Sequence, residues 1–116
     1  MNRNVMIVDD DLSSLFAFET VLQYGGFQVT AVDRGEKCLE ALEGGFKGVI
    51  LIDIMMPEMD GWETIKEITN RDFLEGNVIS IVTAVDNSSP DKEGVSQYIT
   101  DCIIKPVDGD KLVSIV

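Results

Sequence analysis

The sequence predicts a doubly wound α/β fold, in which a five-stranded parallel sheet carries helices on both faces. Four short runs, residues 5–8, 49–52, 78–82 and 102–104, are almost continuously apolar, as is typical of strands that are covered on both faces. A fifth run, residues 27–32, alternates apolar and polar side chains, which favours a strand nearer the edge of the sheet. Segments with helical spacing separate these runs, and this alternation indicates right-handed crossover connections.

Apolar side chains in the first three intervening segments recur every three or four residues, so each segment has an apolar face that can pack against the sheet. The first helix is predicted to end at Gly25-Gly26 and the second at Gly44-Gly45, because glycine commonly follows the last residue of a helix. The apolar residues are Leu12, Leu15, Phe16, Val21 and Leu22 in the first segment, Leu39 and Leu42 in the second, and Trp62, Ile65 and Ile68 in the third. The three in the third segment share one face, and we interpret them as core, not as cofactor contacts.

A fourth helix is predicted to begin at Ser89-Pro90, where Ser89 would be the N-cap and Pro90 the first helical residue. Only Val95, Tyr98 and Ile99 follow as apolar anchors. This helix should therefore be weakly held.

Length and composition indicate one domain. The chain has 116 residues, enough for one compact domain over residues 1–116 and too few for two. The last helix, from about residue 110, is predicted to be short or truncated, because the chain ends barely two turns later. No apolar run approaches the roughly 18 residues of a membrane span, and acids directly after residue 8 argue against a signal peptide. We expect a cytoplasmic location and no membrane partner.

Charge and residue types limit the ligands that the chain can take. The net charge of −12 would repel nucleic acid and anionic lipid, so direct binding of nucleic acid is not expected. The chain has no histidine, and its two cysteines lie in apolar stretches without the spacing of metal ligands. We expect Cys38 and Cys102 to be buried small hydrophobic residues, not a disulfide or a zinc site. Mg²⁺, which prefers oxygen ligands, is the cation favoured where the acids converge.

Polar residues follow four of the predicted strands, at the edge where the carboxyl ends of parallel strands meet and ligands bind. Each of them alone has a structural explanation as a helix cap, a turn, a strand end or a surface charge. Together they would gather carboxylates, a hydroxyl and an ammonium group at one edge. They are Asp9, Asp10 and Asp11 after the first strand, Asp53 after the third, Thr83 after the fourth and Lys105 after the fifth.

This set of groups suits phosphoryl transfer. Two carboxylates about 4 Å apart repel by roughly 4 kcal/mol at an effective dielectric near 20, so a cluster of them needs a compensating cation. Mg²⁺ uses one or two carboxylates and keeps positions for water and phosphate oxygens. An aspartate can accept a phosphoryl group when a metal and a lysine neutralise the charge on the transferred oxygens. Asp53 is the natural acceptor.

Four segments occur in the order and with the spacing of the motifs of a known family. They are VMIVDDD (5–11), LIDIMMPEMDGWE (51–63), IVTA (81–84) and IIKPV (103–107). Together they resemble the response regulator receiver domains of two-component signal transduction, over essentially the whole chain. The resemblance implies a flavodoxin-like sheet of strand order 2-1-3-4-5 and a signalling switch. It implies no enzyme beyond Mg²⁺-assisted self-phosphorylation and slow self-dephosphorylation.

The resemblance also assigns the metal ligands. Asp53 would be the phosphoacceptor, and Asp10 and Asp53 would bind Mg²⁺ directly. Asp9 would contribute through a water molecule, and Met55 through its backbone carbonyl.

Further residues would act on the phosphoryl group or shape the site. Thr83 and Lys105 would hold the phosphoryl oxygens, and the bond before Pro106 would be cis, which proline permits at low cost. Gly61 would allow the tight turn into the third helix. The sequence departs from the family at Cys102, where an aromatic ring usually turns inward on activation, so the switch should differ from the usual one.

The partners implied are a phosphate donor and an effector. Because the chain has no histidine, a phosphohistidine donor must be another protein, either a sensor histidine kinase or a phosphotransfer protein. Phosphorylation is expected to change the face made by the fourth helix, fifth strand and fifth helix. A homodimer, if one forms, is expected to use the same face.

Competing functions fit less well. A flavodoxin-type electron carrier needs a phosphate-binding loop where this chain has three aspartates. A phosphatase or phosphomutase would normally carry an acid at position 55, where this chain has Met55. No glycine-rich dinucleotide loop or P-loop follows the first strand. The main alternative is a receiver-like interaction module that works without phosphorylation.

Overall fold

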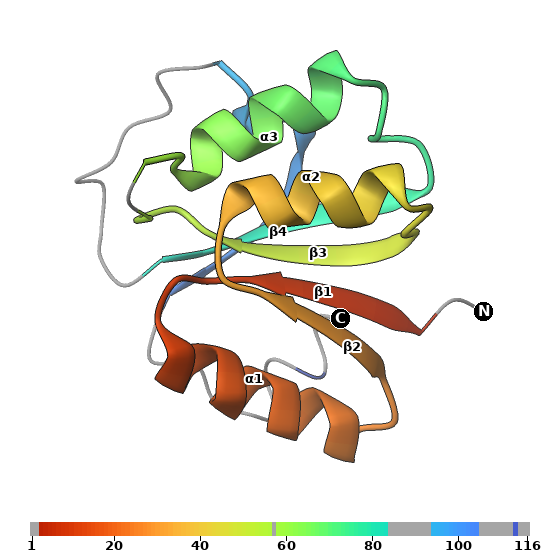
Figure 1. Cartoon of the computed structure of the whole chain (residues 1–116), viewed down its shortest axis with the longest axis vertical. Helices are drawn as coiled ribbons and strands as arrows, with labels where there is room; N and C mark the ends of the chain where they lie inside the picture. The colour runs from red at the N-terminus through yellow and green to blue at the C-terminus, as the bar shows by residue number, and fades with distance from the viewer. Residues whose placement is uncertain (1–2, 57, 84–93, 105–112, 114–116) are drawn as a thin grey trace.

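A parallel sheet of five strands forms the centre of the computed structural model (Figure 1), which describes residues 3–56, 58–83, 94–104 and 113. The spatial order of the strands is β2-β1-β3-β4-β5, as predicted. This order brings the carboxyl ends of β1 and β3, which are far apart in the sequence, next to each other. The strands are β1 (Asn4–Val8), β2 (Gln28–Val32), β3 (Gly48–Asp53), β4 (Asn77–Thr83) and β5 (Ile99–Ile104).

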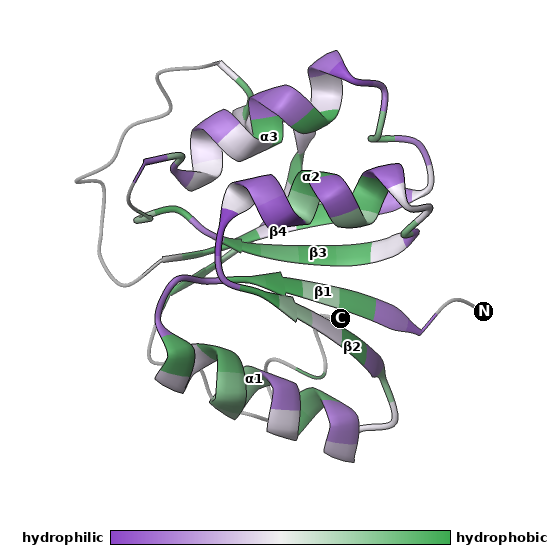
Figure 2. Ribbon diagram, viewed as in Figure 1, coloured by the Kyte–Doolittle hydropathy of each residue, from purple (hydrophilic) through white to green (hydrophobic). Residues whose placement is uncertain are grey.

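Helices cover both faces of the sheet, so the prediction of a doubly wound fold is confirmed. Helix α1 (Leu12–Tyr24) lies on one face, and α2 (Gly35–Glu43) and α3 (Gly61–Asn70) lie side by side on the other (Figure 1). Colouring by hydropathy shows green, apolar residues along β1 and β3 and purple, polar residues on the outer sides of α2 and α3 (Figure 2). Among the described residues, no helix is long and apolar enough to cross a membrane.

The sheet divides the hydrophobic core into two parts. Successive side chains of a strand point to opposite faces, so neighbouring residues of β1 and β3 enter different clusters. Met6 and Ile50 pack with α2 and α3, whereas Val5 and Leu51 pack with α1. All four are fully buried. The continuous apolar runs of the sequence therefore reflect burial on both faces.

The apolar residues of α1 do not all face the core. Leu15, Phe18 and Leu22 are buried, but Leu12 and Phe16 are 69% and 70% exposed. Phe16 lies about 100° further around the helix than Leu15, outside the buried stripe. Since apolar residues occupy both sides of α1, their spacing alone does not identify the inner face.

The segment before β5 also differs from the prediction. Residues 96–98 form a single turn of 3₁₀ helix (Ser96–Tyr98), and Ile99 already belongs to β5, where it pairs with Ile79. The predicted anchor Ile99 is therefore a strand residue, and β5 begins three residues before the apolar run 102–104. Val95 is buried in the core as expected. Ser89 and Pro90 lie outside the described residues.

One cysteine is buried and the other is not. Cys38 is fully buried on α2, but Cys102 is exposed, contrary to the prediction. Cys102 belongs to β5, an edge strand, and pairs there with Ile81 of β4. Its apolar neighbours in the sequence suggested burial, but an edge strand leaves part of its surface open. Of the predicted last helix only Val113 is described, and it packs against the core on the α1 side.

Candidate functional site

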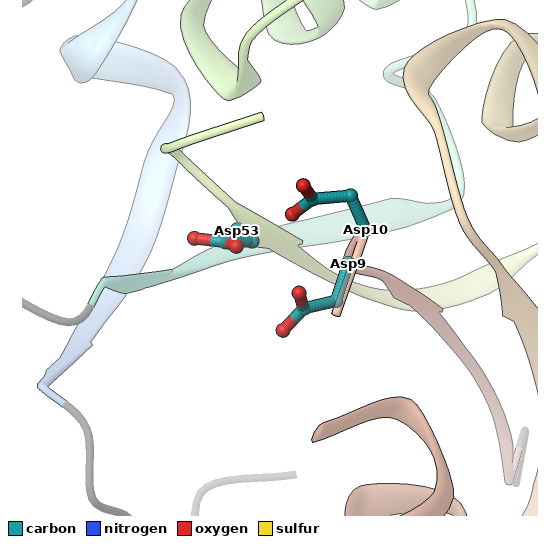
Figure 3. A group of neighbouring side chains, drawn as sticks. All are labelled: Asp9, Asp10 and Asp53. Carbon is teal, nitrogen blue, oxygen red and sulfur yellow. The ribbon is translucent and has the colours of Figure 1, made fainter. Parts of the chain in front are cut away.

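Three carboxylates meet at the carboxyl ends of β1 and β3 (Figure 3). Asp9 and Asp10 directly follow β1, and Asp53 is the last residue of β3. One carboxylate oxygen from each lies within 4.8 Å of the others. Asp9 and Asp53 are 2% and 6% exposed, whereas Asp10 is open to solvent. The structure thus brings together the three aspartates that the sequence predicted as metal ligands.

Backbone hydrogen bonds hold the two buried carboxylates in place. The Asp11 N–H donates to Asp9 Oδ1 over 2.9 Å, and the Met55 N–H donates to Asp53 Oδ1 over 3.2 Å. The Asp9 N–H continues the ladder with β2 by donating to the Val32 carbonyl at 3.1 Å. Each carboxylate therefore accepts from the backbone two residues further on, an arrangement that aspartate favours in turns. These bonds fix the side chains at the edge of the sheet.

Asp11 has a different role. It is the N-cap of α1, and its carboxylate accepts from the Ser13 N–H over 3.2 Å and from the Ser14 hydroxyl over 2.9 Å. A capping aspartate of this kind typically stabilises a helix by about 1 kcal/mol. The sequence run Asp9-Asp10-Asp11 thus divides into two residues of the acidic group and one helix cap.

The carboxyl end of β2 contributes an acid that is already paired with cations. Asp33 lies 3.1 Å from both Arg34 Nε and Lys37 Nζ. Its hydrogen bonds to Arg34 and Lys37 lower the pKa of the Asp33 carboxyl. Asp33 is not one of the three aspartates that gather at β1 and β3.

The acidic group fits a hard divalent cation. At 4.8 Å, two carboxylates repel by about 3 kcal/mol at an effective dielectric of about 20, and Asp9 and Asp53 are both buried. All of the ligand atoms are carboxylate oxygens, which Mg²⁺ and Ca²⁺ prefer and which zinc and copper sites seldom use alone. A site formed by three carboxylates on one side also leaves room for water or phosphate oxygens. Its chemistry therefore agrees with the predicted Mg²⁺.

The remaining predicted site residues are described to different extents. Met55 is the second residue of the loop from β3 to α3, and its side chain is 52% exposed. The backbone of Thr83 ends β4 at the same edge of the sheet, one position beyond the residue that pairs with Asp53. Lys105 and the bond before Pro106 lie outside the described residues.

Gly61 packs directly against the end of β3. A Cβ atom at Gly61 would lie 2.7 Å from the Asp53 carbonyl oxygen and 2.8 Å from Ile54 Cα. The Gly61 N–H also donates to the Ile54 carbonyl over 3.0 Å. Gly61 belongs to the first turn of α3, so the structure explains this glycine by close approach of two backbones, not by the tight turn expected from the sequence.

A capping box, which was not predicted from the sequence, fixes the start of α3. The Asp60 side chain accepts from the Glu63 N–H over 2.9 Å, and the Asp60 N–H donates to the Glu63 carboxylate over 3.2 Å. The signal was present as an aspartate followed three residues later by a glutamate, directly before an apolar stripe.

The family model for the response regulator receiver domain matches residues 5–116. The chain belongs to this family. Among curated relatives, the receiver domain is 34% identical over 109 residues to the transcriptional regulatory protein ZraR of Klebsiella oxytoca. It is 34% identical over 117 residues to the DNA-binding transcriptional regulator NtrC of Escherichia coli K12. These matches cover 94% and 100% of the chain but 24% of each relative, so the receiver domain spans about a quarter of their length.

Solved structures agree with this assignment. A CheY-like response regulator receiver domain protein from Methanospirillum hungatei JF-1 is 40% identical and superposes with a TM-score of 0.90, covering 96% of this chain and 88% of that one. The N-terminal domain of a response regulator receiver protein from Methanoculleus marisnigri JR1 is 32% identical with a TM-score of 0.79, covering 97% and 91%. The predicted family and fold are therefore confirmed.

Proposed function

We propose that the receiver domain is a phosphoacceptor switch, in which Asp53 takes a phosphoryl group from a phosphohistidine in a Mg²⁺-dependent reaction. The observation that carries this proposal is the convergence of three carboxylates within 4.8 Å at the ends of β1 and β3. An Asp53 carboxylate oxygen attacks the phosphorus, an O–P bond forms, and the N–P bond of the phosphohistidine breaks with its electrons returning to the imidazole. The product is an acyl phosphate on Asp53.

Four residues would hold Mg²⁺. Asp10 and Asp53 would bind it directly, Asp9 would act through water, and Met55 would contribute its backbone carbonyl. When bound, Mg²⁺ would supply positive charge that offsets the charge on the transferred oxygens. The Met55 N–H already contacts Asp53 Oδ1, which supports a place for Met55 beside the metal. The hydrogen bonds to Asp9 and Asp53 keep both carboxylates in position before the metal and donor arrive, so little reorganisation is needed.

Two more residues would act on the phosphoryl group itself. Thr83 would donate its hydroxyl to one phosphoryl oxygen, and Lys105 would pair its ammonium with another. The place of Thr83 at the end of β4 supports its role. The role of Lys105 rests on its motif, IIKPV at residues 103–107.

The exposed side of α1 is the surface that we assign to the donor. Every fourth residue along this side of the helix is exposed, so the four side chains form one row: Leu12, Phe16, Thr20 and Tyr24. Three of the four are apolar or aromatic. Glu19 is the one charged residue of α1 (Leu12–Tyr24). The row begins two residues after Asp10, so a protein that packs on it can bring a phosphohistidine to Asp53.

Regulation would act through the face around β5. We propose that phosphorylation alters this face, which then binds an effector or a second copy of the chain. Tyr98, directly before β5, and Ile104, the last residue of β5, are exposed and supply contact area for such a partner. A cytoplasmic location follows from the proposed exchange with a kinase.

Mass spectrometry of the intact protein after incubation with acetyl phosphate and Mg²⁺ tests the proposal. We expect the parent to gain one phosphoryl group and Asp53→Asn to gain none. Omitting Mg²⁺ should also prevent the gain. If the folded parent stays unmodified, the receiver fold serves here as an interaction module without phosphorylation, and the proposal is wrong.

A further inference from the structure

Helix α2 packs against α3 and the loop before it at Gly35, the first residue of α2. Gly35 is buried, and a Cβ atom there would overlap Thr64 Oγ1 and lie 2.9 Å from Met59 Sδ. Real Cβ contacts are essentially never so short. Any larger residue at position 35 therefore has to displace the side-chain atoms of Met59 and Thr64.

Both neighbours of Gly35 belong to the segment that follows the phosphoacceptor. Met59 lies in the loop between Asp53 and α3. Thr64 is fully buried in the first turns of α3, and its hydroxyl donates to the Asp60 carbonyl over 2.9 Å. The contact at Gly35 thus holds the far end of this loop and the start of α3 together.

The start of α3 in turn contacts the backbone of Asp53. Gly61 lies against the Asp53 carbonyl oxygen and donates its N–H to the Ile54 carbonyl. The Met56 N–H donates to the same Ile54 carbonyl over 3.2 Å, which closes the loop at its near end. Because these contacts are between backbones, a side-chain rotation cannot absorb a movement of α3. Such a movement must shift Asp53 or the loop that carries Met55.

We propose that Gly35 is a positioning residue for the metal site. Its missing side chain lets α2 pack against Met59 and Thr64, and this packing sets the position of Met55 and Asp53 through α3. The inference rests on the proposed function, because it assumes that Asp53 and Met55 bind Mg²⁺. Residues that orient metal ligands without touching the metal typically change metal affinity by 10–100-fold when they are substituted.

Gly35→Ala tests this proposal, with Gly44→Ala as the matched control. Gly44 follows the last residue of the same helix, has a φ of −75°, and a Cβ atom there would meet two carbonyl oxygens at 3.4 and 3.6 Å. Alanine is therefore tolerated at 44. Calorimetric titration with MgCl₂, well below the melting temperature of each variant, gives the dissociation constant.

We expect Gly35→Ala to bind Mg²⁺ roughly ten-fold more weakly than the parent, and Gly44→Ala to match the parent. A purely structural role would lower the melting temperature of the metal-free protein and leave the dissociation constant of the folded protein unchanged. That result would overturn the proposal.

Met59→Ala is the second variant, because Met59 is only partly buried and its loss should not prevent folding. It removes the contact with Gly35 from the loop side, and we expect a several-fold weaker affinity for Mg²⁺. If Gly35→Ala does not fold, this variant decides the question, and an unchanged affinity rejects the proposal. If the parent itself binds no Mg²⁺ at millimolar concentration, the proposed function fails and this inference fails with it.

Discussion

The α-carbon of Gly61 lies against the carbonyl oxygen of Asp53, so close that a Cβ atom would come within 2.7 Å of it. Gly61→Ala should therefore push α3 away from β3 and destabilise the domain by about 1–3 kcal/mol, as overpacked cores usually are. Urea unfolding at fixed pH measures this change. Gly44→Ala serves as the control, and equal stability of the two variants would contradict the argument.

Asp10→Asn should stabilise the metal-free domain and abolish its response to Mg²⁺. The substitution removes one charge from three carboxylates that lie within 4.8 Å of one another, and Asp10 is a proposed direct ligand. We expect the variant to melt a few degrees higher than the parent without metal, and to gain nothing from added Mg²⁺. A variant that melts lower than the parent and still accepts phosphate from acetyl phosphate would refute this interpretation of the site.

The double variant Leu12→Ala with Phe16→Ala should slow phosphorylation by a protein donor without changing phosphorylation by a small-molecule donor. Both side chains are exposed on α1 and do not belong to the metal site, so phosphorylation by acetyl phosphate should stay normal. Transfer from a cognate phosphorylated histidine kinase should become roughly ten-fold slower, the loss typical of a central contact residue. Val78→Ala is the control, because Val78 is an exposed apolar residue near the amino end of β4, away from the carboxyl ends of β1 and β3. If all three proteins accept phosphate from the kinase equally fast, the donor uses another surface.

The acyl phosphate on Asp53 should decay slowly without a separate phosphatase. Its hydrolysis needs a water molecule in line with the phosphorus, and the methionine at 55 and the valine at 85 offer no polar group to orient one. Met55 is 52% exposed beside Asp53, whereas Val85 lies outside the described residues. Met55→Asn combined with Val85→Glu should decay at least roughly ten-fold faster in excess Mg²⁺. A double variant that keeps its phosphate as long as the parent would show that these side chains do not control the water.

The two cysteines should react very differently with thiol reagents. Burial raises the pKa of the Cys38 thiol to about 12, so Cys38 stays protonated and covered at pH 8, while Cys102 is exposed. Labelling with a disulfide reagent at pH 8 should modify Cys102 rapidly and Cys38 only after denaturation. Cys102→Ser should remove the rapid reaction. Rapid labelling of that variant in its native state would contradict the burial of Cys38.

The same raised pKa links stability to pH. An unfolded chain exposes Cys38, whose thiol then ionises near its ordinary value of 9.0. Above that pH, ionisation of the exposed thiol stabilises the unfolded state. The contribution of the buried, protonated thiol to the free energy of unfolding is therefore complete below pH 9 and declines as the pH rises toward 12.

The sequence by itself was enough to predict the family, the doubly wound sheet and the three aspartates of the site. These predictions depend on local patterns. A strand buried on both faces needs a continuous apolar run, such as residues 49–52, and the carboxyl end of a parallel strand is where ligands bind. Asp53 follows such a run directly, so its place was visible without coordinates.

Only the tertiary structure decided which residues meet across the fold. It showed that Asp11 caps α1 and that Phe16 faces outward, although its sequence context resembles that of Leu15. It also revealed the contacts of Gly35 with Thr64 and of Gly61 with Asp53. Such close approaches depend on how far two separate elements stand apart, and that spacing is set by the packing of the whole core, which no local pattern of residues contains.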